Sequence, residues 1–202
     1  MAKAPYHHGA LREALLEAAE KLLREEGLSA LTLRAIARAA GVSHGAPAHH
    51  FEDLSALLSE LAAVGFRRLV DQLAAARETR GKVSFPLPKA YLSFAMANRE
   101  LFALMFREER LDARRPSLLE ARAAAIALLS QSLGVKAHGT PAGGPSLKEL
   151  GAMTAAWSLT HGFTVLAIDG RLAPLLRAAP SGTAAEALLE AALGATALVG
   201  RT

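Results

Sequence analysis

Apolar residues recur at steps of three and four along most of the chain, and this spacing constrains the fold more than any other feature. Between Gly9 and Glu26, apolar and charged residues separate onto two faces of a 3.6-residue repeat. The apolar face consists of Leu11, Leu15, Ala18, Ala19, Leu22 and Leu23. Alanine and leucine, both strong helix formers, dominate the 202 residues, whereas β-branched residues are sparse. We therefore expect an all-α protein.

Glycines and hydroxyl side chains divide the first fifty or so residues into three helices. Gly27 can adopt the left-handed conformation that ends the first helix, and Thr32 can cap the second, which ends at Gly41. Ser43 is then placed to cap a short third helix, from about residue 44 to 51. Two short helices joined by a tight glycine-containing turn, behind a longer helix, predict a helix-turn-helix domain over residues 1–52.

Residues 53–202 are predicted to form a larger helical domain. Asp53 can cap a long helix that runs to about Thr79, and Gly65 is a weak point within it. Further helices are expected at 87–97, 99–109, 116–133, 146–169 and 183–199.

Composition excludes several kinds of protein. The sequence contains no cysteine, so disulfides, thiolate metal sites and cysteine nucleophiles are ruled out. We see no apolar run of the ~20 residues that a membrane span requires, and the N-terminal residues lack the apolar core of a secretory signal. We expect a soluble cytoplasmic protein that does not associate with membranes.

Net charge alone does not indicate DNA binding. The chain has a formal charge of +4, but residues 1–54 hold six basic against seven acidic side chains, so the basic excess lies downstream. The stretch Arg107 to Arg115, REERLDARR, mixes both signs and is better interpreted as a solvated helix end and loop than as a second DNA site. DNA binding must therefore be inferred from the geometry of the motif.

The stretch YHHGALREALLEAAEKLLREEGLSALTLRAIARAAGVSHGAPAHHF, residues 6–51, resembles the DNA-binding domain of TetR-type transcriptional repressors. The likeness includes Tyr6 before the first helix, Gly27 after it, the Thr-Leu-Arg opening of the second helix, the Ala-Gly-Val-Ser turn and the closing His-His-Phe. The resemblance implies a transcriptional regulator that binds double-stranded operator DNA, is not an enzyme, and uses no cofactor or metal.

The same resemblance implies roles for individual residues, because the third helix of such a domain enters the major groove. The candidates for facing the bases are His44, Gly45, Ala46, Ala48 and His49. Candidates for contacting the DNA backbone are the amide groups near Thr32 and Leu33, together with Tyr6, His7, Arg34, Ser43 and His50. The family usually has a tyrosine where Ala48 stands and a lysine where Leu54 stands, so a weaker affinity is expected.

Five of the seven histidines lie in this stretch. Histidine gains positive charge below about pH 6.5, so we predict that protonation of His7, His44, His49 and His50 strengthens DNA binding. One alternative is that these histidines are only polar surface. A metal site is disfavoured, because adjacent helical residues diverge by about 100° and no acid or cysteine completes a ligand set.

In the C-terminal half, AWSLTHGFTVLAIDGRL places Trp157 and His161 four residues apart on one helix face. This Trp-x-x-x-His-Gly run, with FALMF at residues 102–106, resembles a signature of one TetR subgroup. The resemblance implies a cavity for a small apolar effector, with His161 as its single polar contact. The candidate ligand-binding residues are Tyr91, Phe94, Phe102, Met105, Phe106, Trp157 and His161. Ordinary core packing is the alternative for these side chains.

The resemblance also makes the last two helices the surface of a homodimer. Small residues and leucines there allow helices to approach closely: Ala184, Leu188, Ala192, Ala195 and Val199. A twofold dimer implies a near-palindromic operator. We expect a repressor that leaves the operator when ligand entry tilts the helix that follows Asp53.

Two other functions are alternatives to a ligand-responsive repressor. A helical hydrolase built on Ser158, His161 and Asp169 is disfavoured, because these residues follow one helix and nothing resembles a nucleophile elbow. The second alternative is a DNA-binding architectural protein with no effector.

Overall fold

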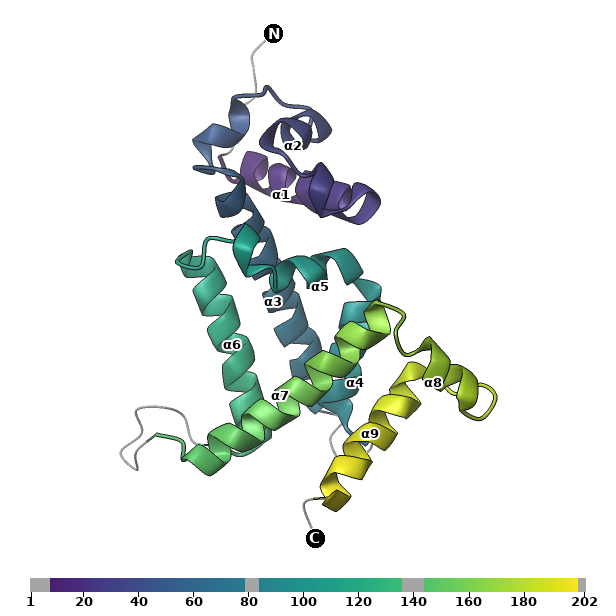
Figure 1. Cartoon of the computed structure of the whole chain (residues 1–202). Helices are drawn as coiled ribbons and strands as arrows, with labels where there is room; N and C mark the ends of the chain where they lie inside the picture. Colours follow the sequence, from purple (N-terminus) through teal and green to yellow (C-terminus); the bar gives the residue numbers. More distant parts are fainter. Residues whose placement is uncertain (1–7, 79–83, 136–143, 200–202) are drawn as a thin grey trace. The chain divides into compact units, whose positions relative to one another are not determined.

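The computed structural model describes residues 8–78, 84–135 and 144–199 (Figure 1). These residues form α-helices and short 3-10 helices and contain no strand, which confirms the all-α prediction. The chain divides into two compact units, one of residues 1–67 and 98–122, the other of residues 68–97 and 123–202. The divisions fall inside α3 (Leu54–Arg77) and α6 (Pro116–Ser132), so both helices contribute to both units.

The first unit begins with α1 (His8–Glu26), η1 (Leu28–Ala30), α2 (Leu33–Ala39) and η2 (Ala46–His49). Two later elements join it, α5 (Arg99–Met105) and η3 (Glu108–Arg110), and α1 packs against both α2 and α5 (Figure 1). Its largest fully buried side chains are Leu15, Leu23, Leu31, Ile36, Phe51, Leu57, Leu58, Leu61, Phe102 and Leu104.

The predicted helix boundaries in this unit have the expected local causes. Gly27 and Gly41 adopt positive φ angles of 80° and 69°, which close α1 and the α2 turn. The Thr32 hydroxyl accepts a hydrogen bond of 3.1 Å from the Ala35 amide, and an Asp53 carboxylate oxygen accepts one of 2.8 Å from the Ala56 amide. These caps begin α2 and α3 where the sequence predicts them.

The third helix differs from the prediction. A short α-helix was expected over residues 44–51, whereas the structure has the 3-10 helix η2 over four residues. Pro47 has no N–H to donate, and the amides of Ala46 and Ala48 bond three residues back, to Ser43 and Gly45. The expected Ser43 side-chain cap is also wrong, because no side chain caps η2 and Ser43 contributes its carbonyl oxygen instead.

Two further elements depart from expectation. The helix expected over 99–109 ends at Met105, because Phe106 and Arg107 bond back only three residues and the turn tightens before η3. The second unit contains a short helix, α8 (Ala173–Ala178), that the sequence did not predict. It begins at a proline-containing first turn after Gly170, whose φ of 71° ends the preceding helix.

The second unit consists of α4 (Pro86–Ala97), α7 (Leu147–Ile168), α8, α9 (Ala185–Val199) and the remaining parts of α3 and α6. Its core is the cluster Leu92, Phe163, Leu172 and Leu189. An ion pair of 2.5 Å between Lys89 and Glu190 further ties α4 to α9. Ser146 and Glu149 form a reciprocal capping box at the start of α7.

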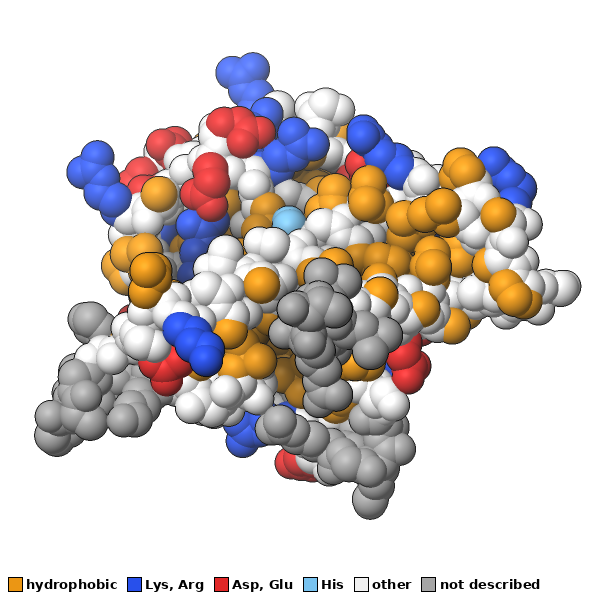
Figure 2. Space-filling model, turned by 60° about the horizontal axis from the view of Figure 1, so that its bottom comes forward, with side chains coloured by type: hydrophobic (Ala, Val, Ile, Leu, Met, Phe, Trp, Pro, Cys, Tyr) orange, Lys and Arg blue, Asp and Glu red, His pale blue; other side chains and the backbone are white. Residues whose placement is uncertain are grey.

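Helix α7 buries few of its own residues. Thr160, Phe163 and Thr164 are buried, whereas its large apolar residues Leu147, Leu150, Trp157, Val165 and Leu166 are all more than one-third exposed. Hydrophobic side chains accordingly reach the surface in the view of Figure 2. Helix α7 therefore leaves much of its apolar surface uncovered within the described residues.

Candidate DNA-binding interface

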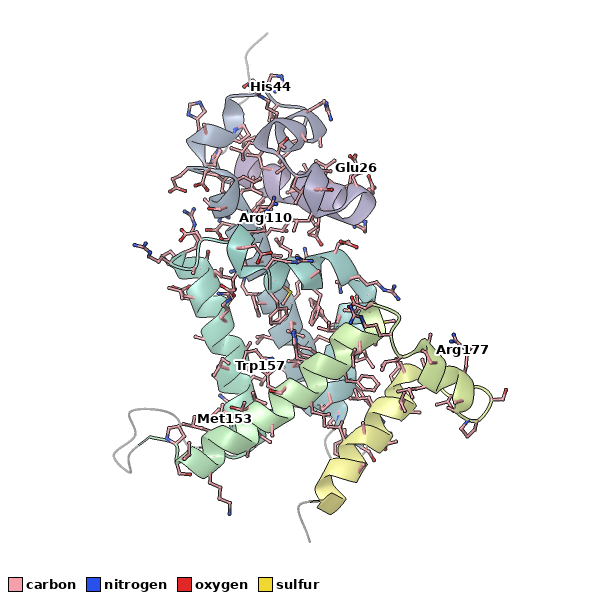
Figure 3. The ribbon with its side chains drawn as sticks, in the orientation of Figure 1. Glu26, His44, Arg110, Met153, Trp157 and Arg177 are labelled. Carbon is pink, nitrogen blue, oxygen red and sulfur yellow. The ribbon has the colours of Figure 1, made fainter. Side chains whose placement is uncertain are left out.

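The segment between α2 and α3 presents most of the predicted base-facing residues to solvent. Ser43, His44, Gly45, Ala48 and His49 are exposed, and His44 projects away from the ribbon in Figure 3. Ala46 is different: it is buried, as is the adjacent Pro47, so it is not presented to solvent. His50 is half-buried. The exposed surface of this segment, called the recognition segment below (residues 43–49), is therefore small and polar.

The start of α2 offers the expected backbone donors. Thr32 and Arg34 are exposed and Leu33 is half-buried. The Ala35 amide donates its hydrogen bond to the Thr32 hydroxyl. The N–H groups in the first turn of an α-helix point along the helix axis, where a phosphate can accept hydrogen bonds from them. Tyr6 and His7, the other predicted backbone contacts, lie outside the described residues.

A charged cluster that the sequence did not predict lies behind the recognition segment. Its centre is Glu60 on α3, whose side chain is only 8% exposed. Glu60 pairs with Arg12 of α1 and accepts a hydrogen bond of 2.9 Å from Arg115 Nε, while Arg115 Nη1 donates one of 2.8 Å to Glu52. These contacts join α1, the start of α3 and the residue that precedes α6. We call Arg12, Glu52, Glu60 and Arg115 the arginine–glutamate cluster.

Electrostatics explains how a carboxylate is kept at this buried position. Burial on its own raises the pKa of Glu60, but the hydrogen bond from Arg115 and the positive charge of Arg12 outweigh it, so the pKa lies below its usual 4.5. The pKa of Arg115 is raised in turn, chiefly by its hydrogen bond to Glu60. Both groups are therefore charged at neutral pH.

The sequence gives one weak signal for this cluster and no signal for its pairing. Glu60 interrupts the apolar residues Leu57, Leu58 and Leu61 on α3, which marks it as a charge on the buried side of a helix. Its partners are 48 and 55 residues away along the chain. No helical spacing rule connects residues so far apart.

The predicted ligand-binding residues fall into two groups. In the second unit, the Tyr91 hydroxyl lies 2.8 Å from His161 Nδ1, and the Trp157 ring stands edge-on to that of His161 (Figure 3 labels Trp157). Burial raises the pKa of Tyr91 and lowers that of His161, so both are neutral at pH 7. Phe94 is buried on the same helix as Tyr91.

The other three ligand candidates lie in the first unit. Phe102 and Met105 are almost completely buried. The ring of Phe106 is tilted against that of Phe102, with centroids 5.0 Å apart, and meets that of Phe66 edge-on at 5.5 Å. Met105 also lies against Gly65: a Cβ at that glycine would come 2.7 Å from Met105 Sδ. These contacts are those of a tightly packed core.

The described part of the chain offers neither a metal cluster nor a membrane-spanning helix. Within residues 8–78, 84–135 and 144–199, no group of three or more histidine, aspartate or glutamate side chains is arranged to hold a metal ion. No helix in the same residues combines the length and apolarity needed to cross a bilayer.

Comparison with known proteins matches both parts of the chain to one family. Residues 15–61 match the family model described as bacterial regulatory proteins, tetR family, and residues 87–194 match the model described as tetracyclin repressor-like, C-terminal domain. No curated protein sequence matches the chain.

Solved structures resemble almost the whole chain. A protein of unknown function from Rhodococcus sp. RHA1 is 36% identical, with a TM-score of 0.69 over 94% of this chain and 95% of that one. TetR-family regulators from Marinobacter aquaeolei VT8 (18% identity, TM-score 0.54, 90% and 92% covered) and Thermus thermophilus (PfmR; 22%, 0.54, 88% and 93%) share the fold. The two family models and the helix-turn-helix together show that this chain belongs to the TetR family of DNA-binding transcriptional regulators, which are not enzymes.

Proposed function

We propose that the protein is a homodimeric repressor that binds a near-palindromic operator through the recognition segment and is released by a small apolar ligand. The observation that carries this proposal is the exposure of Ser43, His44, Gly45, Ala48 and His49 in the turn and short helix that follow α2. Side chains on such a segment reach base edges, while the amides of α2 contact phosphate.

The proposed homodimer uses α7 and α9. Along α7, the small residues Gly151, Ala155, Ser158 and Gly162 and the exposed Leu166 recur at steps of three and four, so they share one face that a partner helix can approach closely. Of the residues that the sequence predicts for this surface, Ala184, which precedes α9, and Ala195 are exposed, Leu188 and Ala192 are half-buried, and the Val199 side chain is outside the described residues. A twofold axis through this face supplies two recognition segments.

The proposed effector site is that of the subgroup with the Trp-x-x-x-His-Gly motif. Its best support is the contact of Trp157, His161 and Tyr91, which puts one hydrogen-bonded imidazole among aromatic rings. Phe94 is buried on the same helix as Tyr91, whereas Phe102, Met105 and Phe106, the other residues that the sequence predicts, belong to the first unit. Ligand entry would tilt α3 and change the separation of the two recognition segments.

Selection of bound sequences from random double-stranded DNA tests the proposal. We expect enrichment of one sequence with two inverted half-sites, bound by two protein chains. Recovery of no preferred sequence, or of an asymmetric site bound by a single chain, would contradict it. A thermal-shift screen with apolar metabolites and acyl-CoA esters, followed by operator release with each compound that stabilises the protein, tests the effector separately.

A further inference from the structure

The recognition segment has little structure of its own to hold it. Its helix η2 spans four residues, and only Ala46 and Pro47 of it are buried. The chain is anchored instead at the two residues that follow His50. Phe51 is 1% exposed, with the Arg12 guanidinium 5.7 Å from its ring centroid, and Glu52 accepts a 2.8 Å hydrogen bond from Arg115. Each anchor is therefore contacted by an arginine from a distant part of the chain.

Glu60 joins these two anchors. Arg12 and Arg115 both pair with its carboxylate, one with each oxygen, so the guanidinium over Phe51 and the guanidinium on Glu52 are held by the same buried group. The Asp112 amide adds a 2.8 Å hydrogen bond to the hydroxyl of Ser59, the residue before Glu60. The loop before α6 is thus fastened to α3 at two successive residues.

The stretch REERLDARR therefore contains two kinds of arginine. Arg114 is exposed, as expected of a solvated loop, whereas the side chain of Arg115 is only 19% exposed and divides its guanidinium between two carboxylates. Opposite charges so well paired and hydrogen-bonded are costly to separate, and the loss of one leaves the other unpaired in a buried place.

We propose that Glu60, Arg12 and Arg115 are positioning residues for DNA binding, which orient the recognition segment through Phe51 and Glu52 without contacting DNA themselves. The proposal rests on the operator binding proposed above. It predicts that operator affinity depends on Arg115, although this arginine belongs to neither the helix-turn-helix nor the effector candidates.

The test compares Arg115→Gln with Arg114→Gln in the full-length protein, using the DNA sequence that selection recovers for the wild type. Both variants lose one positive charge from adjacent positions, so they change long-range attraction to DNA equally. We expect Arg115→Gln to weaken binding at least tenfold and Arg114→Gln to stay within twofold of the wild type. If Arg115→Gln does not fold, Arg115→Lys replaces it in the test. Lysine keeps the charge but lacks the planar guanidinium that bonds both carboxylates, so Arg115→Lys should weaken binding at least threefold.

Three readouts separate positioning from other roles. If Arg115 only stabilised the fold, Arg115→Gln would lower the unfolding temperature. Its operator affinity, measured well below that temperature, would then equal that of the wild type. A phosphate contact by Arg115 would reduce the slope of log Kd against log salt by about one, whereas positioning leaves the slope unchanged. In a Glu60→Gln background, removal of Arg115 should have a smaller effect on affinity than in the wild type.

Equal affinities of the Arg115→Gln and Arg114→Gln proteins, or a reduced salt slope, would overturn the positioning role while leaving operator binding intact. If the wild-type protein itself selects no DNA sequence, operator binding fails first. The two failures are therefore distinguishable.

Discussion

At the residue scale, the buried charge of Glu60 links the stability of the first unit to pH. Its pKa is lower in the folded protein than the usual 4.5, so the folded state favours the ionised form. This contribution is fully present above the unfolded-state pKa and is lost as pH falls through the folded-state pKa. The protein should therefore lose stability on acidification below about pH 4.5, partly through this one group.

Glu60→Gln isolates this contribution. We expect the substitution to reduce the free energy of unfolding at pH 7 by about 2 kcal/mol, because it replaces hydrogen bonds to a charged acceptor with neutral ones. The deficit should shrink as the pH falls through the lowered pKa of wild-type Glu60, because that carboxyl group then also becomes neutral. Urea unfolding of both proteins at several pH values measures it, and a deficit that does not change with pH would show that charge is not the cause.

At the element scale, separation along the chain explains which features the sequence could predict. Helix periods and the caps at Thr32 and Asp53 depend on residues within four positions of one another, so they are readable locally. The same holds for the shared face of Trp157 and His161. Pairings such as Tyr91 with His161, or Glu60 with Arg115, depend on tertiary packing across 70 and 55 positions, and no local pattern encodes them.

Gly65 shows this limit within one helix. In the sequence it is a weak point of α3, but in the structure side chains of α5 pack against it: Met105 Sδ lies 2.7 Å and Leu101 Cγ 3.2 Å from where a Cβ would stand. Met105 is completely buried, so its side chain has no open space to enter. The cost of glycine in a helix is offset by this packing.

Gly65→Ala should therefore destabilise the protein. A methyl group here overpacks the core by about 1–3 kcal/mol, against a gain of about 1 kcal/mol in helix propensity, so we expect a net loss near 1 kcal/mol. In a Met105→Ala background the added methyl enters vacated space, and the same substitution should become neutral or stabilising. Thermal and chemical unfolding of the four proteins check the pair, and a stabilising effect in the wild-type background would contradict it.

At the scale of the whole molecule, the exposed apolar residues of α7 support the proposed homodimer. Leu166 is 41% exposed on the face formed by glycine, alanine and serine residues of this helix. Leu175 belongs to a different helix, α8, and is 58% exposed. The two leucines therefore serve as test and control for the proposed dimer surface.

Leu166→Glu should give a monomer, because a twofold dimer would bury two unpaired carboxylates, one from each chain, in its interface. Leu175→Glu should remain dimeric. Sedimentation equilibrium measures the assembly state, and operator affinity should fall at least tenfold in Leu166→Glu, since one recognition segment then binds without its twin. A dimeric Leu166→Glu protein with normal affinity would place the interface elsewhere.

The discontinuous make-up of the first unit has a practical consequence for building hybrid regulators. Residues 98–122 pack with residues 1–67 and supply Arg115, Phe102 and Met105. A graft that transplants only the N-terminal helices onto another regulator's sensor would leave Glu60 and Gly65 facing foreign neighbours. A successful exchange must carry two separate stretches of the gene, or recreate in the recipient the arginine that the second stretch provides.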